Sequence, residues 1–177
     1  LDSFDTFSII EKISSSGECY KVSKDGSEYF AKITYVVVND INKKQILDKA
    51  ATYKSISYPS ISPFSEVFEK DNQVGYTSPF YSSNSLKETL TNLNSTEKTI
   101  SMYGFACALK NLKDKRIIPS NLNGLEKIVF DSDKRPILSG FYFSELDEVA
   151  YEDNNFFVPP EVSGSQSLKE SSLSYIF

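Results

Sequence analysis

The fold of this 177-residue chain is decided by the stretch Arg116-Ile117-Ile118-Pro119-Ser120-Asn121-Leu122-Asn123-Gly124-Leu125-Glu126-Lys127-Ile128-Val129-Phe130. It is typical of a polar loop that runs into a short apolar strand. Asp131-Ser132-Asp133 then predicts the turn of a small hairpin. The returning segment is Pro136-Ile137-Leu138-Ser139-Gly140-Phe141. We interpret the rest of the sequence by its position before or after this loop and hairpin.

Strands dominate the chain before residue 80. Alternating apolar residues and β-branched or aromatic side chains favour strands at 7–13, 18–22, 28–38, 64–69 and 73–78. Asp25-Gly26 is a strong hairpin signal between the second and third of these strands. Lys70-Asp71-Asn72 joins the last two. Strands first and helices after them, with a joint near residue 80, predict a two-lobed α+β plan.

One helix is expected among these strands. Asp40 is placed to cap a helix over 41–56, which Tyr58-Pro59 would end. The side chains expected on one side of this helix are Ile46, Leu47, Ala50, Ala51 and Tyr53.

After the joint the pattern becomes helical. A brief helix is expected at 86–93 and a long one at 96–114, with Ser95 and Glu97 near its start. The apolar stripe expected on the long helix consists of Ile100, Tyr103, Ala106, Cys107 and Leu112.

Composition excludes several classes of function. The net charge of −5 disfavours a nucleic-acid partner, and no apolar run approaches the ~20 residues of a membrane helix. The chain has no histidine, which excludes Ser-His-Asp and Cys-His nucleophiles and imidazole metal sites. Cys19 and Cys107 are expected to be buried thiols in a reducing, intracellular setting, namely the cytoplasm. The first residue is Leu1 rather than Met, so we expect the chain to be excised from a longer one.

With these segments in register, the chain resembles the protein kinase superfamily from about Phe7 onward. Pro159-Pro160-Glu161 resembles the Ala-Pro-Glu that closes a kinase activation segment. The resemblance implies one kinase-like domain over 1–177, with an antiparallel sheet and one helix in an N-lobe at about 1–78. It also implies a hinge at 79–82 and a mainly helical, apparently truncated C-lobe at 83–177.

The resemblance assigns five positions to nucleotide binding. Gly17 is the one glycine left in the turn that would cover the phosphates, and Lys32 in Tyr29-Phe30-Ala31-Lys32-Ile33 matches the lysine of Val-Ala-Ile-Lys. Ser78 stands at the gatekeeper position of the hinge. The Pro79 carbonyl and the Tyr81 amide remain as partners for adenine.

The helix glutamate that pairs with this lysine in active kinases falls on Lys49. Two like charges ~4 Å apart at an effective dielectric near 20 would repel by about 4 kcal/mol. We therefore expect the helix to turn away from Lys32, and Asp48 offers a substitute pair only in another helix orientation.

The catalytic positions are degenerate. Asn121 replaces the catalytic aspartate and Asn123 the nearby lysine, so we expect no catalytic residue. Ser139 replaces the usual metal-binding aspartate, and Glu126 at the metal-binding asparagine position is a doubtful ligand. Mg²⁺ binding is therefore doubtful, whereas metal-independent ATP binding remains open.

These losses favour a pseudokinase, that is, a kinase-like module with a regulatory or scaffolding role. Its expected partners are other proteins, or other domains of the same longer chain, without nucleic acid or membrane insertion. Two alternatives stay open: a divergent active kinase that transfers phosphate from ATP to Ser, Thr or Tyr, and an unrelated α+β interaction domain.

Overall fold

The computed structural model divides the chain into two compact units. It describes residues 3–4, 6–13, 18–81, 89, 91–117, 119, 128–143 and 146. Unit 1 comprises Leu1–Ser57 and Ser62–Tyr81, and unit 2 comprises Tyr58–Ile61 and Ser82–Phe177. The turn predicted at 14–17 and most of the helix predicted at 86–93 lie outside the described residues.

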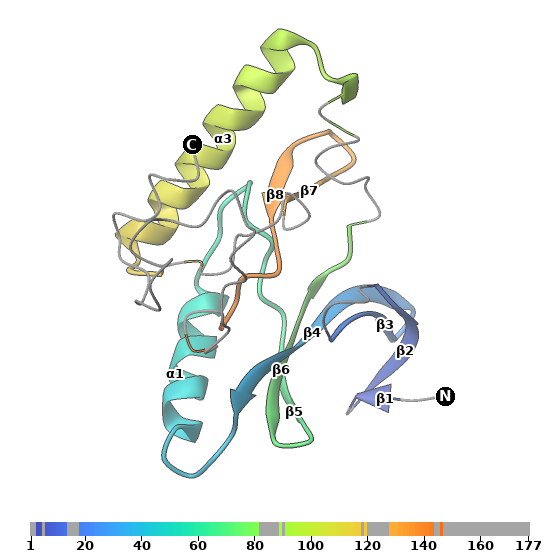
Figure 1. The fold of residues 1–177 in the computed structure, drawn as a ribbon, viewed down its shortest axis with the longest axis vertical. Coiled ribbons are helices and arrows are strands. Elements are labelled where there is room, and N and C mark those ends of the chain that lie inside the picture. Colours follow the sequence, from blue (N-terminus) through green and yellow to red (C-terminus); the bar gives the residue numbers. More distant parts are fainter. Residues whose placement is uncertain are drawn as a thin grey trace, which may run out of the picture. The chain divides into compact units, whose positions relative to one another are not determined.

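Unit 1 is built on an antiparallel sheet of six strands in the order β1-β2-β3-β4-β6-β5 (Figure 1). The strands are β1 (Ser3–Phe4), β2 (Phe7–Lys12), β3 (Cys19–Lys24), β4 (Ser27–Val37), β5 (Val67–Lys70) and β6 (Gln73–Pro79). Residues 64–66, predicted to begin a strand, precede β5. β1 was not predicted.

Two tight turns set the register of this sheet. The backbone has positive φ angles at Asp25 (52°) and Gly26 (79°) between β3 and β4. It does so again at Asp71 (51°) and Asn72 (62°) between β5 and β6. Two successive residues with positive φ give the turn whose twist matches that of antiparallel strands. Both predicted hairpins are confirmed.

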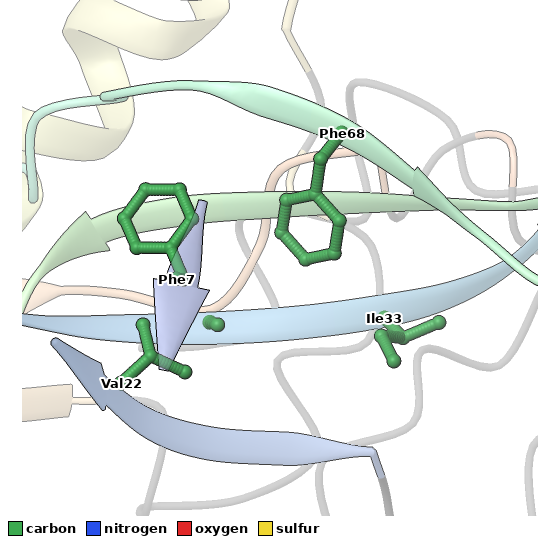
Figure 2. Packing of buried hydrophobic residues seen from close by; sticks show 5 residues of the cluster. Phe7, Val22, Ile33 and Phe68 are labelled. Carbon is green, nitrogen blue, oxygen red and sulfur yellow. The ribbon is translucent and has the colours of Figure 1, made fainter. Parts of the chain in front are cut away.

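A hydrophobic cluster covers one face of the sheet. It consists of Phe7, Val22, Ala31, Ile33 and Phe68, each at most 8% exposed (Figure 2). Successive side chains of a strand point to opposite faces. Because Ala31 and Ile33 belong to this cluster, the residues between and beside them in β4 face the other way.

Helix α1 (Lys43–Lys54) also belongs to unit 1. Its N-cap is Asn42, so the prediction that Asp40 caps the helix is wrong. The Asn39 side chain accepts hydrogen bonds from the backbone of Ile41 and Asn42, and this turn delays the start of the helix. Of the predicted apolar side, Ile46, Ala50 and Tyr53 are buried, whereas Leu47 and Ala51 are exposed.

Unit 2 contains the long helix α3 (Ser95–Asp114), close to the predicted bounds. Asn94 is its N-cap. The Asn94 side chain accepts from the Glu97 amide (3.0 Å), and the Glu97 carboxylate accepts from the Asn94 amide (2.8 Å). This is a capping box, which satisfies two backbone donors at once.

The predicted apolar stripe of α3 is largely wrong. Ile100 is 65% exposed and Tyr103 is 74% exposed. The residues that the helix buries are Ser101, Phe105, Ala108, Leu109 and Leu112. They recur at intervals of three and four, so they form a single face, and Leu112 alone belongs to both sets.

The predicted hairpin of unit 2 is confirmed. Strands β7 (Ile128–Phe130) and β8 (Pro136–Leu138) are antiparallel (Figure 1). The segment Tyr58–Ile61 lies beside β8, because Ile61 bridges Leu138 in parallel and the Ser60 carbonyl accepts from the Leu138 amide at 2.9 Å. A short piece of chain from between α1 and β5 is thus built into unit 2.

Asp131 organises the turn between β7 and β8. One carboxylate oxygen accepts from the amides of Asp133 and Arg135, each at 2.9 Å, and the other accepts from the Arg135 guanidinium at 2.7 Å. Burial raises the pKa of Asp131, but the hydrogen bonds from Arg135 and Asp133 outweigh it and hold the pKa below its usual value. The ionised form therefore stabilises the folded turn.

Asp131→Asn is expected to lower the free energy of unfolding by about 1–2 kcal/mol at neutral pH, because charge-assisted hydrogen bonds are lost. A carboxylate whose pKa is lowered by folding stabilises the fold above its unfolded-state pKa, and this contribution is lost as pH falls through the folded-state pKa. The difference between wild type and variant should therefore shrink when urea unfolding is measured at pH 3 rather than pH 6. Asp133→Asn, with a side chain 70% exposed, is the matched control and should cost less than about 0.5 kcal/mol. A difference that does not change with pH would contradict this role of Asp131.

Candidate functional site

Lys32 lies in the middle of β4 and is the most buried lysine among the described residues, at 8% exposed. Its neighbours across the sheet are Cys19 on β3 and Tyr76 on β6. Because Ala31 and Ile33 face the Phe7 cluster, Lys32 lies on the opposite face. The prediction of a lysine set in an apolar strand is confirmed, whereas what it binds is untested.

Aromatic side chains lie on the face of the sheet that carries Lys32. The Tyr76 ring contacts that of Phe30 with centroids 6.5 Å apart, and that of Phe64 at 6.2 Å. Phe64 in turn contacts Tyr53 of α1 at 5.7 Å. The rings therefore connect the strand opposite Lys32 to helix α1. Sequence reasoning did not find Tyr76, since the cross-strand partner of Lys32 depends on register.

The predicted hinge residues follow directly along β6. Ser78 lies opposite Phe30, on the same face as Lys32, and its side chain is fully buried. Its hydroxyl makes no hydrogen bond to any described residue. Pro79 ends the strand, and Tyr81 beyond it is half-buried. The Lys21 ammonium lies 4.7 Å from the centre of the Phe80 ring, a cation–π contact that fixes the start of this segment.

The base of the turn predicted to cover phosphates is closed by polar contacts. The Glu18 carboxylate pairs with the Lys12 ammonium at 2.8 Å and accepts a hydrogen bond from the Tyr20 hydroxyl. These two hydrogen bonds lower the pKa of Glu18, and the bond to Glu18 raises the pKa of both Lys12 and Tyr20. The backbone closes the same base through a bond from the Ile13 amide to the Cys19 carbonyl at 2.8 Å. Gly17 itself lies outside the described residues.

The helix position predicted to replace the kinase glutamate is also described. Lys49 is half-buried, and Asp48 is exposed. Asp48 forms no ion pair with any lysine in the described part of the chain, so the substitute pair with Lys32 is not made. Whether α1 turns away from Lys32 because of Lys49 stays a prediction.

In unit 2, Ser139 directly follows β8 and is 7% exposed. Gly140 has a positive φ of 72°, and Phe141 is buried. A sharply turned backbone thus follows a strand at the position predicted for the metal ligand, but the side chain there is a neutral hydroxyl. Hydroxyls are weak ligands for Mg²⁺ compared with carboxylates. Asn121, Asn123 and Glu126, as well as Pro159-Pro160-Glu161, lie outside the described residues.

A thiol contact in unit 2 was not found from the sequence. Cys107 on α3 hydrogen-bonds with the phenols of Tyr58 and Tyr103. Burial and then this bond raise the pKa of Tyr58, whereas for Tyr103 the bond is the larger cause. Tyr58 begins the segment that joins β8, so the contact attaches this segment to α3. Cys19 and Cys107 are half-buried rather than buried, and both remain thiols.

Comparison with solved structures identifies the fold. The chain matches the crystal structure of the Mycobacterium tuberculosis PknI kinase domain with a TM-score of 0.71 and 16% identity, over 99% of this chain and 72% of that one. A double mutant of the same domain matches with a TM-score of 0.73 and 15% identity, over 99% and 73%. The chain therefore has the fold of a protein kinase domain, as predicted.

The sequence comparisons agree with this fold but are weaker. The Saccharomyces cerevisiae cell cycle serine/threonine-protein kinase CDC5/MSD2 is 28% identical over 120 residues, which cover 64% of this chain. The match covers only 17% of that protein's length. No family model matches the chain.

No helix in the described ranges has the length and apolar character needed to cross a membrane.

Proposed function

We propose that this chain is a pseudokinase, a kinase-like module that binds ATP weakly and without metal and acts by regulating or scaffolding other proteins. Its partners are other proteins or further domains of a longer chain. The half-buried thiols of Cys19 and Cys107 suit a reducing intracellular compartment such as the cytoplasm.

The observation that carries the proposal is the contrast between Lys32 and Ser139. The lysine expected to meet the phosphates is kept on a buried strand. The position expected to hold the metal ion, Ser139, directly follows β8 and has no carboxylate. Phosphoryl transfer needs both a phosphate-binding cation and a metal ligand. A chain that keeps the first position and lacks the second supports binding rather than turnover.

Thermal unfolding of this chain with ATP, in EDTA and in Mg²⁺, tests the proposal. ATP at ten times its Kd is expected to raise the free energy of unfolding by about 1.4 kcal/mol. For a chain of this size that corresponds to a midpoint about 3–5 °C higher. The shift should be the same in both buffers, because no carboxylate at position 139 recruits the metal.

Lys32→Met should abolish the shift, because the methionine fills the buried position without a charge. Lys54→Met, at an exposed position in the last turn of α1, should leave the shift intact. A shift seen only with Mg²⁺, together with phosphate transfer, would overturn the proposal in favour of a divergent active kinase. An unchanged midpoint in both buffers would exclude the nucleotide-binding part.

A further inference from the structure

The connection between β4 and α1 exposes large apolar side chains. Tyr35 is 60% exposed, Val37 is 55% and Ile41 is 94%, and Leu47 on α1 is 53% exposed. Figure 1 shows that this connection links the end of β4 to the first turn of α1, and the Asn42 side chain donates to the Val37 carbonyl at 2.7 Å. Apolar surface of this kind commonly marks an interaction site.

Ile41 is exposed at a position where an apolar side chain often packs against the helix that follows. It immediately precedes the N-cap Asn42, the position from which an apolar side chain often packs against the fourth helical residue. That fourth residue is Ile46, which is 4% exposed and buried without Ile41. Ile41 therefore does not staple the helix, and the folded unit gains little from an isoleucine there.

The charges beside Ile41 are also unfavourable for the helix. The first turn of α1 carries Lys43 and Lys44 and no acidic residue, and the N-cap makes no side-chain hydrogen bond to it. The start of a helix bears partial positive charge, so lysines there are destabilising and acidic groups are preferred. Both lysines are exposed, and within the described residues neither forms an ion pair, although Asp40 and Asp48 lie nearby in sequence.

We propose that these residues form a docking surface for an acidic segment of a partner protein that carries bulky apolar side chains. The surface, called the α1 docking surface, consists of Ile41, Lys43, Lys44 and Leu47 at the start of α1. Tyr35 and Val37 are not part of it, because they alternate with Ile33 onto the face of the sheet that carries the Phe7 cluster. Carboxylates of the partner would meet the two lysines and the positive helix end, and its apolar side chains would cover Ile41 and its neighbours.

Charge also decides against other occupants. The chain has a net charge of −5, so a second copy or an anionic membrane is repelled as a whole. A short acidic segment of a partner protein needs only the local attraction of Lys43 and Lys44. The net charge of the whole chain matters less for such a segment than for a second copy or a membrane. The proposal goes beyond nucleotide binding and does not depend on it.

A random 12-residue peptide library displayed on phage, selected on the wild-type chain in EDTA without ATP, tests this surface. The variant K43E/K44E is used to remove peptides that bind elsewhere. Enriched peptides are expected to combine aspartate or glutamate with aromatic or aliphatic residues. As synthetic peptides they should bind wild type at least tenfold more tightly than K43E/K44E or Ile41→Ser.

The unfolding midpoint of each variant distinguishes a loss of peptide binding from a loss of folding. K43E/K44E places acids at the start of α1, so its unfolding midpoint should rise by about 1–4 °C while peptide binding falls. The control K113E/K115E changes the charge equally at exposed positions near the end of α3, and it should bind the peptides like wild type.

Three results would overturn the proposal. They are enriched peptides without acidic residues, equal binding to K43E/K44E, and Ile41-dependent self-association or binding to phosphatidylserine vesicles in place of peptide binding. None of these results would change the ATP-dependent midpoint, so this proposal and the nucleotide-binding proposal fail independently.

Discussion

Gly75→Ala is expected to destabilise unit 1 by about 3 kcal/mol or more, as overpacking in a filled core does at its upper end. A Cβ atom at residue 75 would lie 2.2 Å from Cε2 and 2.3 Å from Cζ of the Phe68 ring. Separations under 3.0 Å essentially never occur for real Cβ atoms. Phe68 cannot move aside cheaply, because it is 8% exposed and its ring packs near that of Phe7 (Figure 2).

Urea unfolding followed by circular dichroism measures the effect, and amide exchange of β5 and β6 locates it. Gly104→Ala on α3 is the control, because its Cβ would lie 3.3 Å from the Ser60 hydroxyl and alanine favours a helix by about 1 kcal/mol. Combining Gly75→Ala with Phe68→Leu should cost less than the sum of the two changes, since the smaller side chain relieves the clash. A Gly75→Ala variant within 0.5 kcal/mol of wild type would show that the Phe68 ring is not held where Figure 2 places it.

Local chemistry made the strands of unit 1 predictable. The Asp25-Gly26 pair adopts the positive φ angles that a two-residue hairpin needs, so the register of β3 and β4 follows from the turn. From this register the position of Lys32 beside Cys19 follows as well. Tyr76 could not be placed in the same way. The pairing of β4 with β6 shifts after Ile33, where the Thr34 hydroxyl donates to the Val74 carbonyl, and that irregularity is a tertiary contact.

The buried face of α3 shows where a hydrophobic pattern is insufficient. Apolar residues occur on both sides of this helix, so Ile100 and Tyr103 look as suitable for the core as Phe105 and Leu109. The segment Tyr58–Ile61 decides between them, because it approaches the helix closely enough that a Cβ at Gly104 would contact Ser60. Ser60 lies 44 residues before Gly104 in the sequence, so the segment that selects the buried face leaves no local signal in the helix itself.

The start of α1 was misplaced for a different reason. Asp40 and Asn42 are both acceptable N-caps by residue type. The Asn39 side chain takes the backbone donors of Ile41 and Asn42 into a turn of its own, so the helix begins only at Lys43. Side chains here compete for the same backbone amides, and the local geometry decides which of them succeeds. Helix propensity does not predict the outcome.

Phosphoryl transfer by this chain is expected to be below about 10⁻² s⁻¹, against 1–100 s⁻¹ for typical kinases. Asn121 cannot accept a proton as a carboxylate does, and loss of a general base costs about 10²- to 10⁴-fold. Ser139, at the position that the proposal gives to a metal ligand, has no carboxylate to offer. Transfer of radiolabelled phosphate from ATP in Mg²⁺ to a mixed Ser/Thr/Tyr peptide pool should therefore give the same rate for wild type and Lys32→Met. A rate that falls at least tenfold in Lys32→Met would contradict the assignment as a pseudokinase.

Ser139→Asp should restore metal-dependent binding without restoring turnover. The aspartate would supply a carboxylate directly after β8, so ATP should raise the unfolding midpoint by several degrees more in Mg²⁺ than in EDTA. Ser139→Asn is the matched control, because it has nearly the same shape and no charge, and its midpoint should be the same in both buffers. Turnover should stay low in Ser139→Asp, since Asn121 and Asn123 still lack the base and the positive charge. If Ser139→Asp gained no Mg²⁺ dependence while wild type bound ATP, residue 139 would not face the nucleotide. The loss of catalysis would then have to be assigned to the Asn121 and Asn123 positions.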